Sequence, residues 1–128
     1  MKIISPLKIE IPRKTMKNKE YILNLNNYRN WHYIVSNQIK DAYTFAMGKQ
    51  LSGLRFKKIK IILKYFKGTE RKCDRANIYC IHEKFFCDAL VCHGVIEDDN
   101  DDFIKESVYL AVELDKVNPR VEIEIQEV

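Results

Sequence analysis

The sequence contains no apolar run of about 18 residues, the length that a membrane-spanning helix needs. Its first residues, from Met1 to Pro6, also lack the longer apolar core that is typical of a secretory signal peptide. Low-complexity tracts, internal repeats and interdomain linkers are absent too. These absences predict a single cytoplasmic domain over residues 1–128 with no membrane partner. The chain, 46% hydrophobic and 31% charged, is long enough to bury a core.

Cysteine and histidine do not occur at the spacing that a zinc site needs. No two of these residues in the second half of the chain are three or four positions apart, and no C-x-x-C is present. We therefore expect reduced thiols in a cytosolic protein and no zinc. The residues concerned are Cys73, Cys80, Cys87, Cys92, His82 and His93.

Acidic residues are scarce in the first part of the chain. Residues 1–72 contain 17 Lys and Arg but only 4 Asp and Glu, whereas residues 73–128 contain 5 and 14. The net charge of +4 therefore hides a basic front and an acidic back. This asymmetry favours a polyanion as the partner of the front and cations as partners of the back. Two differently charged solvated faces would give the same counts.

Hydrophobic periodicity divides the first half of the chain into elements. Residues 2–12 alternate weakly and suit an edge strand, and residues 13–20 are expected to be a basic loop. Residues 31–47 have helical spacing, with Asn30 in position to cap the helix and Gly48 to end it. Residues 54–67 are the clearest strand, with lysines at 58, 60 and 64 opposite an apolar face of Ile59, Ile61, Leu63 and Tyr65.

The end of the chain has the pattern of a hairpin. Residues 103–112 resume strand character, although helical spacing over residues 103–114 is an alternative. Residues 115–119 supply a turn, and residues 120–127 alternate strictly. The predicted fold is therefore α+β, a small mixed β-sheet of about four strands packed against two main helices in a single domain.

Residues 77–93 between these halves are predicted to form the second main helix. At about 100° per residue, Asn77, Lys84 and Asp88 fall within about 40° of one another and form a polar stripe. A second stripe is apolar and should face the sheet: Ile78, Ile81, Phe85, Ala89 and Cys92. Asp74 stands just before the helix, where its carboxylate can cap free N–H groups or bind a cation.

Carboxylates at both ends of this helix suggest phosphodiester chemistry. Gly94 is expected to end the helix, and Asp98 and Asp99 follow in an acidic loop. Mg²⁺ prefers oxygen ligands, commonly from two or three aspartates. Such an ion lowers the pKa of bound water and neutralises phosphate charge, and a lysine adds positive charge. The ordered set Asp74, Lys84, Asp88, Asp98 and Asp99 therefore predicts a metal-dependent nuclease site.

A further set of side chains is predicted to contact nucleic acid. An asparagine-rich segment with an arginine can bind phosphate. Lysines just before an acidic site suit a phosphate track, although lysines also protect exposed strands from aggregation. Whether Tyr28 and Trp31 stack on a base or join the core stays open. The predicted nucleic-acid-binding residues are Asn26, Asn27, Arg29, Lys58, Lys60, Lys64, Lys67, Arg71, Lys72 and Asn77.

The order of these motifs resembles that of the RusA-like crossover-junction endodeoxyribonucleases. The front motif is Leu25-Asn26-Asn27-Tyr28-Arg29. The back motif consists of Asp74-Arg75-Ala76-Asn77, Lys84-Phe85-Phe86-Cys87-Asp88-Ala89-Leu90, Gly94 and Asp98-Asp99. The resemblance covers about residues 21–127.

The resemblance implies a small homodimeric Holliday junction resolvase, often phage-borne, that acts in DNA recombination and repair. It would make paired nicks in four-way DNA with Mg²⁺ or Mn²⁺. Asp74 and Asp99 would be metal-binding catalytic aspartates, Lys84 the essential lysine and Asp98 an auxiliary acid. A twofold dimer would present two such sites to the two equivalent strands of a junction.

Two positions depart from the family pattern. Ala76 stands where the family has a second acid, and the gap from Asn77 to Lys84 is four residues longer. Glu83, Asp88 and Asp98 are the candidates to supply the missing ligand. If Asp74 and Asp99 share one ion, their oxygens should lie roughly 3–4 Å apart. The alternatives are a non-catalytic nucleic-acid-binding protein on the same fold and a basic α+β domain with a protein partner.

Overall fold

The structure is a computed structural model that describes residues 2–128. Within these residues no helix is both long and apolar enough to cross a membrane. The elements, in chain order, are β1 (Lys2–Ser5), β2 (Lys8–Ile11), β3 (Lys19–Ile22), α1 (Leu25–Asn30), α2 (Tyr33–Leu51), β4 (Ile59–Lys67), α3 (Arg75–Cys92), β5 (Ile104–Tyr109), β6 (Glu113–Leu114) and β7 (Arg120–Glu127).

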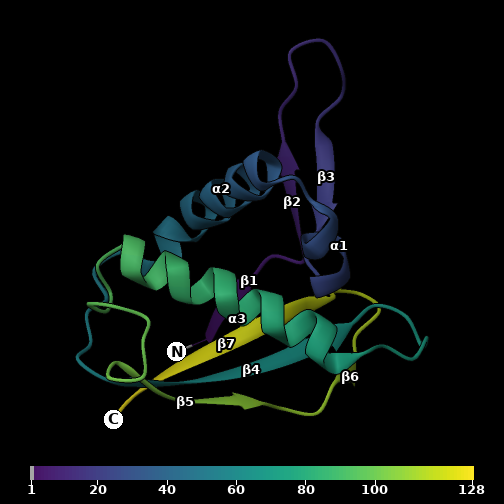
Figure 1. Cartoon of the computed structure of the whole chain (residues 1–128). Coiled ribbons are helices and arrows are strands. Elements are labelled where there is room, and N and C mark those ends of the chain that lie inside the picture. Colours follow the sequence, from purple (N-terminus) through teal and green to yellow (C-terminus); the bar gives the residue numbers. More distant parts are fainter. Residues whose placement is uncertain (1) are drawn as a thin grey trace.

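The main sheet is mixed and has the strand order β1-β7-β4-β5, with the short β6 also beside β4. Strand β7 runs antiparallel to β1 and β4, whereas β5 and β6 run parallel to β4. The two long helices, α2 and α3, lie together on one side of this sheet (Figure 1). The predicted α+β fold, a small mixed sheet against two main helices, is confirmed.

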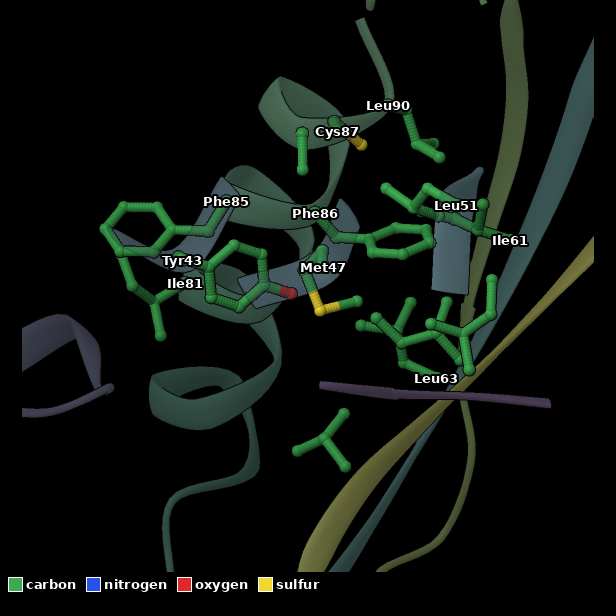
Figure 2. Packing of buried hydrophobic residues seen from close by; sticks show 14 of the residues in the cluster. Tyr43, Met47, Leu51, Ile61, Leu63, Ile81, Phe85, Phe86, Cys87 and Leu90 are labelled. Carbon is green, nitrogen blue, oxygen red and sulfur yellow. The ribbon is translucent and has the colours of Figure 1, made fainter. Parts of the chain in front are cut away.

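The core lies between the helices and the sheet. β4 begins at Ile59, later than predicted, and its residues Ile59, Ile61 and Leu63 are fully buried, as the alternation indicated. Each large apolar side chain buried here contributes about 1.5–3 kcal/mol, so the core determines where α3 lies. Figure 2 shows the side chains that meet: Tyr43, Met47 and Leu51 of α2, Ile61 and Leu63 of β4, and Ile81, Phe85, Phe86, Cys87 and Leu90 of α3.

Residues 103–112 and 120–127 do not form the predicted hairpin. Both strands exist, as β5 and β7, and β7 has the predicted bounds. However, β4 lies between them: Ile61 is opposite Ile125 of β7 on one side and Ser107 of β5 on the other. The connection through β6 is long enough to pass from one edge of β4 to the other. The local pattern specified the strands but not their partners.

Residues 2–12 form two strands where one was predicted. The chain leaves the sheet at Pro6, which has no N–H to donate to a ladder. β1 pairs with β7, whereas β2 pairs with β3 in a separate two-stranded sheet. The loop predicted at residues 13–20 is therefore shorter, since Lys19 and Glu20 already belong to β3.

The first long helix has different ends from those predicted. The side chain of Asn24 accepts a hydrogen bond from the backbone N–H of Asn27 at 2.7 Å and caps α1. Asn30 is the last residue of α1, where its Nδ2 donates to the carbonyl of Asn26 at 3.0 Å, and His32 in its place is the N-cap of α2. Gly48 does not end α2, which continues to Leu51, and the side chain of Leu51 is buried in the core one turn after that of Met47.

Helix α3 covers the predicted helical segment and begins two residues earlier, at Arg75. Gly94, with a φ of 71°, follows the helix and lets the chain turn back, which a side chain would disfavour. Ile81, Phe85 and Ala89 of the predicted apolar stripe are buried, but Cys92 is exposed.

Candidate functional site

The predicted site residues fall into two groups at opposite ends of α3. Asp74 directly precedes the helix, and Asp88 lies 14 residues later, a separation of about 20 Å along a helix axis. Asp99 follows α3 and lies near enough to Asp88 for the charge of Asp88 to act on its pKa. The structure therefore does not bring Asp74 and Asp99 of one chain close enough to share an ion.

The first group, the helix-start cluster, consists of Asp74, Asn77 and the cations Lys67, Lys72 and Arg75. Asp74 occupies the N-cap position, yet its exposed side chain makes no capping hydrogen bond. The three cations, with Cys73, Ala111 and Val112, line an open hollow of about 680 Å³. Cations gathered in one hollow can bind a phosphate group. The exposed carboxylate of Asp74, next to them in the chain, can offer an oxygen ligand to a metal ion.

Helix α1 is joined directly to the helix-start cluster. The backbone N–H of Asn26 donates to Oδ1 of Asn77 at 3.0 Å, which links the two motifs of the sequence. Asn27 has a structural part, because its Nδ2 donates to the carbonyl of Ile22 at 3.1 Å. Arg29 is exposed at the end of α1, where its guanidinium can reach a ligand.

Tyr28 and Trp31, left undecided by the sequence, are half-buried and pack against the core. The rings of Tyr28 and Phe85 meet edge to face with centroids 6.1 Å apart, and those of Tyr28 and Trp31 do so at 6.1 Å. Trp31 also meets Tyr21 of β3 at 5.7 Å. These aromatic residues hold α1 and β3 onto α3 and are not an open stacking platform.

The second group, the acid cluster, consists of Glu83, Asp88, Asp98 and Asp99. Partial burial raises the pKa of Asp99, and its hydrogen-bonded neighbour Asp98 and the charge of Asp88 raise it further. The backbone N–H of Asp99 also donates to Oδ1 of Asp98 at 2.8 Å. Carboxylates that repel one another in this way are stabilised by a bound cation.

Glu83 ties α3 to the edge strand β5. Its two carboxylate oxygens accept hydrogen bonds from Ser107 Oγ at 2.9 Å and Tyr109 OH at 2.5 Å. Burial, followed by the hydrogen bond to Glu83, raises the pKa of the Tyr109 hydroxyl. The sequence indicated Glu83 as a substitute ligand but not these two partners, because nothing in its local pattern shows that β5 lies beside α3.

Lys84 and Lys40 flank the acid cluster. Lys84 is exposed and precedes Asp88 by four residues, so the two side chains are neighbours on the helix surface. Lys40 of α2 forms an ion pair with Asp88 at 3.6 Å, a contact between helices that the sequence did not indicate. A metal ion bound to Asp88 would have to displace Lys40. The cost of this is small, because an exposed ion pair of this kind contributes only about 0–1 kcal/mol.

The predicted lysine track is divided in the structure. Lys60 and Lys64 lie on the face of β4 opposite the buried one and pair with Glu106 at 3.6 Å and Glu113 at 3.3 Å. Lys58 and Arg71 are exposed just before and after β4. Only Lys67 and Lys72 join the helix-start cluster. The structure thus separates Lys60 and Lys64 from α3 by the thickness of the sheet.

A buried serine–histidine pair gives the appearance of a second hydrolytic site. Ser5 Oγ is 2.7 Å from His82 Nδ1 and 2.6 Å from Tyr43 OH, and all three residues are fully buried. Burial lowers the pKa of His82 to about 3, so its ring is neutral. Since no substrate can reach these atoms, we assign the three residues to the core.

Within the described residues of one chain the acidic side chains offer two neighbouring carboxylates and not a full set of metal ligands. No three His, Cys, Asp or Glu side chains among residues 2–128 lie together in a way that would hold a metal ion. Mg²⁺ nevertheless needs only one or two carboxylates when it keeps several waters. Asp88 and Asp99 fit that share, with Asp98 next to them. Asp74 does not join them within one chain.

Comparisons with known proteins add no family assignment. The chain matches no protein-family model, and no curated protein matches it. The resemblance therefore rests only on the two sequence motifs, the front one at residues 25–29 and the back one from Asp74 to Asp99.

Proposed function

We propose that the chain is a Mg²⁺-dependent DNA endonuclease that resolves four-way junctions as a homodimer, in the manner of the RusA-like enzymes. The observation that carries this proposal is the acid cluster, where Asp99 is hydrogen-bonded to Asp98 and is near enough to Asp88 for that charge to raise its pKa. Partial burial and mutual repulsion keep these carboxylates poised for a cation. The exposed Lys84, one turn before Asp88, adds the positive charge that a phosphate needs.

In this proposal the acid cluster and the helix-start cluster, at the two ends of α3, have different roles in cutting. Asp88 and Asp99 would hold the ion, which supplies an activated water and neutralises phosphate charge when bound. Lys84 orients the phosphate, and the cations of the helix-start cluster bind a neighbouring one. Asp99 has to lose its proton before it can bind a metal, so its raised pKa makes cutting weaker at low pH.

A twofold dimer gives Asp74 a place in this site. One chain holds Asp74 just before α3 and Asp99 in the loop after it, and Asp88, which is near Asp99, lies about 20 Å from Asp74 along the helix axis. If two copies pack with their α3 helices antiparallel, Asp74 of each chain comes near Asp99 of the other. Two composite sites then form. In each of them Asp88, which is near Asp99, takes the place of the acidic ligand that is missing at Ala76.

A non-catalytic nucleic-acid-binding protein is the second candidate. It is favoured by the absence of a three-ligand group within residues 2–128 and by Ala76. In that case the helix-start cluster would still bind phosphate. Glu83 would then have only a structural role, through its hydrogen bonds to Ser107 and Tyr109, and so would Asp88, through its ion pair with Lys40. The two candidates differ in whether DNA is cut.

The test is a nicking assay with the purified chain, Mg²⁺ or Mn²⁺, and a synthetic four-way junction beside a linear duplex of the same sequence. We expect symmetrical nicks in the junction. Asp99→Asn should slow cutting about 100-fold or more, as loss of one electrostatic stabiliser does elsewhere, and leave binding intact.

Asp101→Asn is the matched control, because it makes the same chemical change at an exposed position of the same loop. It should cut at the rate of the unchanged chain. Junction binding without cutting under either metal would establish the second candidate, and equal rates for the two variants would remove Asp99 from the mechanism.

A further inference from the structure

Residues 8–22 form an arm whose strands pack against the core at their base and whose tip projects from the body of the protein (Figure 1). Strands β2 and β3 pair with each other over four residue pairs, from Lys8 opposite Ile22 to Ile11 opposite Lys19. Within the described residues neither strand joins the main sheet. Figure 1 shows the arm rising past the end of α2, with the loop of residues 12–18 at its tip.

The tip of the arm carries positive charge only. Residues 12–19 are all exposed and contain Arg13, Lys14, Lys17 and Lys19 but no acid. Of the ion pairs formed within residues 2–128, none includes these four cations. By contrast, Lys8 at the base is paired with Glu20 at 3.2 Å. Four cations without counter-charges at the end of a projection indicate a polyanionic ligand.

The arm is firmly held at its base and closed at its tip. Ile9 and Leu23 are buried in the core, and the backbone N–H of Leu23 donates to the carbonyl of Leu7 at 2.9 Å. At the tip, Nε of Arg13 donates to the carbonyl of Lys17 at 2.8 Å. The cations are therefore presented by an ordered hairpin, which lowers the entropy lost when a ligand binds.

The arm is connected to the helix-start cluster through α1, the next element along the chain. β3 is followed by α1, whose Asn26 N–H bonds to Asn77 in the first turn of α3. We propose that the arm binds the phosphate backbone of DNA that flanks the junction, on the Asp74 side of the molecule. This inference rests on the proposed function, because that function supplies DNA as the polyanion.

Other partners fit the tip less well. A protein interface has an apolar core, but Met16, 62% exposed, is the one large hydrophobic residue in the loop of residues 12–18. A membrane-binding element inserts several apolar or aromatic side chains, which this loop does not have. Phosphate contacts made by lysine and arginine need neither.

The first experiment measures DNA binding without cutting, in EDTA, over a range of salt concentrations. The arm variant is Lys14→Gln, Lys17→Gln and Lys19→Gln, which keeps the Arg13 contact that closes the tip. The control variant is Lys2→Gln, Lys49→Gln and Lys116→Gln, which removes the same charge from exposed positions elsewhere. Both sets lie at the surface, so both variants should unfold at the temperature of the unchanged chain.

The arm variant should bind junction DNA more weakly, with a slope of log affinity against log salt reduced by up to about 2.7, since each phosphate contact contributes about 0.9. The control should keep its affinity within about twofold, because distant charges are screened. In a second experiment, a photo-crosslinking amino acid at Met16 should attach to junction DNA, whereas the same group at Val117, 95% exposed in another loop, should not.

The outcomes separate the two proposals. If the unchanged chain binds DNA and the arm and control variants lose affinity equally, the arm proposal fails and the proposed function stands. If the unchanged chain binds no DNA even at low salt, both fail. If it instead binds anionic phospholipid vesicles and only the arm variant loses that binding, the arm contacts a membrane and the proposal is overturned.

Discussion

Asn26 and Asn77, 51 positions apart in the sequence, are joined by a hydrogen bond of 3.0 Å from the backbone N–H of Asn26 to Oδ1 of Asn77. This contact places α1 against the first turn of α3. Arg75, the first residue of α3, lines the hollow together with Lys67 and Lys72. Both asparagines were predicted to contact nucleic acid, and the structure shows that they also contact each other.

Substitutions of Asn77 should separate its structural part from its part in binding. Asn77→Ala removes the acceptor of the Asn26 N–H and should lower the free energy of unfolding by about 1 kcal/mol. Asn77→Asp keeps the acceptor and adds a charge that suits a helix N-terminus, so stability should be retained. Its negative charge should nevertheless weaken DNA binding. Urea unfolding and DNA titration, run on both variants, measure the two effects; weaker folding of Asn77→Asp would contradict this account.

Mixing two inactive chains should restore one active site if the sites are shared between protomers. Asp74→Asn and Asp99→Asn are each expected to slow cutting about 100-fold or more. In a mixed dimer, however, one composite site keeps both aspartates and the other loses both. Co-expression with two affinity tags isolates this dimer, and a gel assay should then show single nicks in place of paired ones.

The same mixture distinguishes a site built within one chain. In that case each chain of the mixed dimer lacks one essential aspartate, and no cutting returns. A dimer of Asp99→Asn with the unchanged chain is the matched control, and it should also make single nicks in either arrangement. Full inactivity of the mixed dimer would therefore exclude composite sites.

Acid should destabilise the protein through His82. Burial lowers the pKa of His82 to about 3, and Nε2 is buried with no hydrogen-bond partner in the described part of the chain. Below the ordinary histidine pKa of about 6.5, His82 is protonated in the unfolded chain but stays neutral in the folded chain. Stability is therefore complete above that pH and falls toward pH 3, by up to about 1.4 kcal/mol per pH unit.

Denaturant unfolding at pH 7, 6 and 5 measures this slope. His82→Gln should be less stable at pH 7 but should lose less stability between pH 7 and 5 than the unchanged chain does. His93→Gln, at an exposed histidine that follows α3, is the control and should keep the full slope. A slope that is unchanged by His82→Gln would show that other groups cause the acid sensitivity.

Cys87 should be the slow thiol of the four. Burial, together with the nearby charges of Glu83, Asp99 and Asp88, raises its pKa to about 12. The thiolate is the reactive form of cysteine. A thiol reagent should therefore react quickly with the exposed Cys73, Cys80 and Cys92, and with Cys87 only after the chain unfolds. The measurement is a count of thiols over time, native and in denaturant. Cys87→Ala should remove only the slow one, and four equal rates would refute the prediction.

Much of the fold was predictable because it depends on local periodicity. The buried face of β4, the bounds of β7 and the position of α3 each follow from the spacing of apolar residues within one segment. The helix caps were less predictable, since Asn24 and Asn30 are equally suitable residue types and only the backbone shows which one caps.

The sequence by itself determined the α+β class, the segments that build the core and the uneven distribution of charge. Only the tertiary structure decided that β4 separates β5 from β7, that Lys60 and Lys64 face away from α3, and that β2 and β3 form a separate basic arm. It also placed Asp74 and Asp99 at opposite ends of α3. The reason is physical: apolar periodicity specifies which face of an element is buried, whereas strand partners and side-chain neighbours depend on how the elements pack.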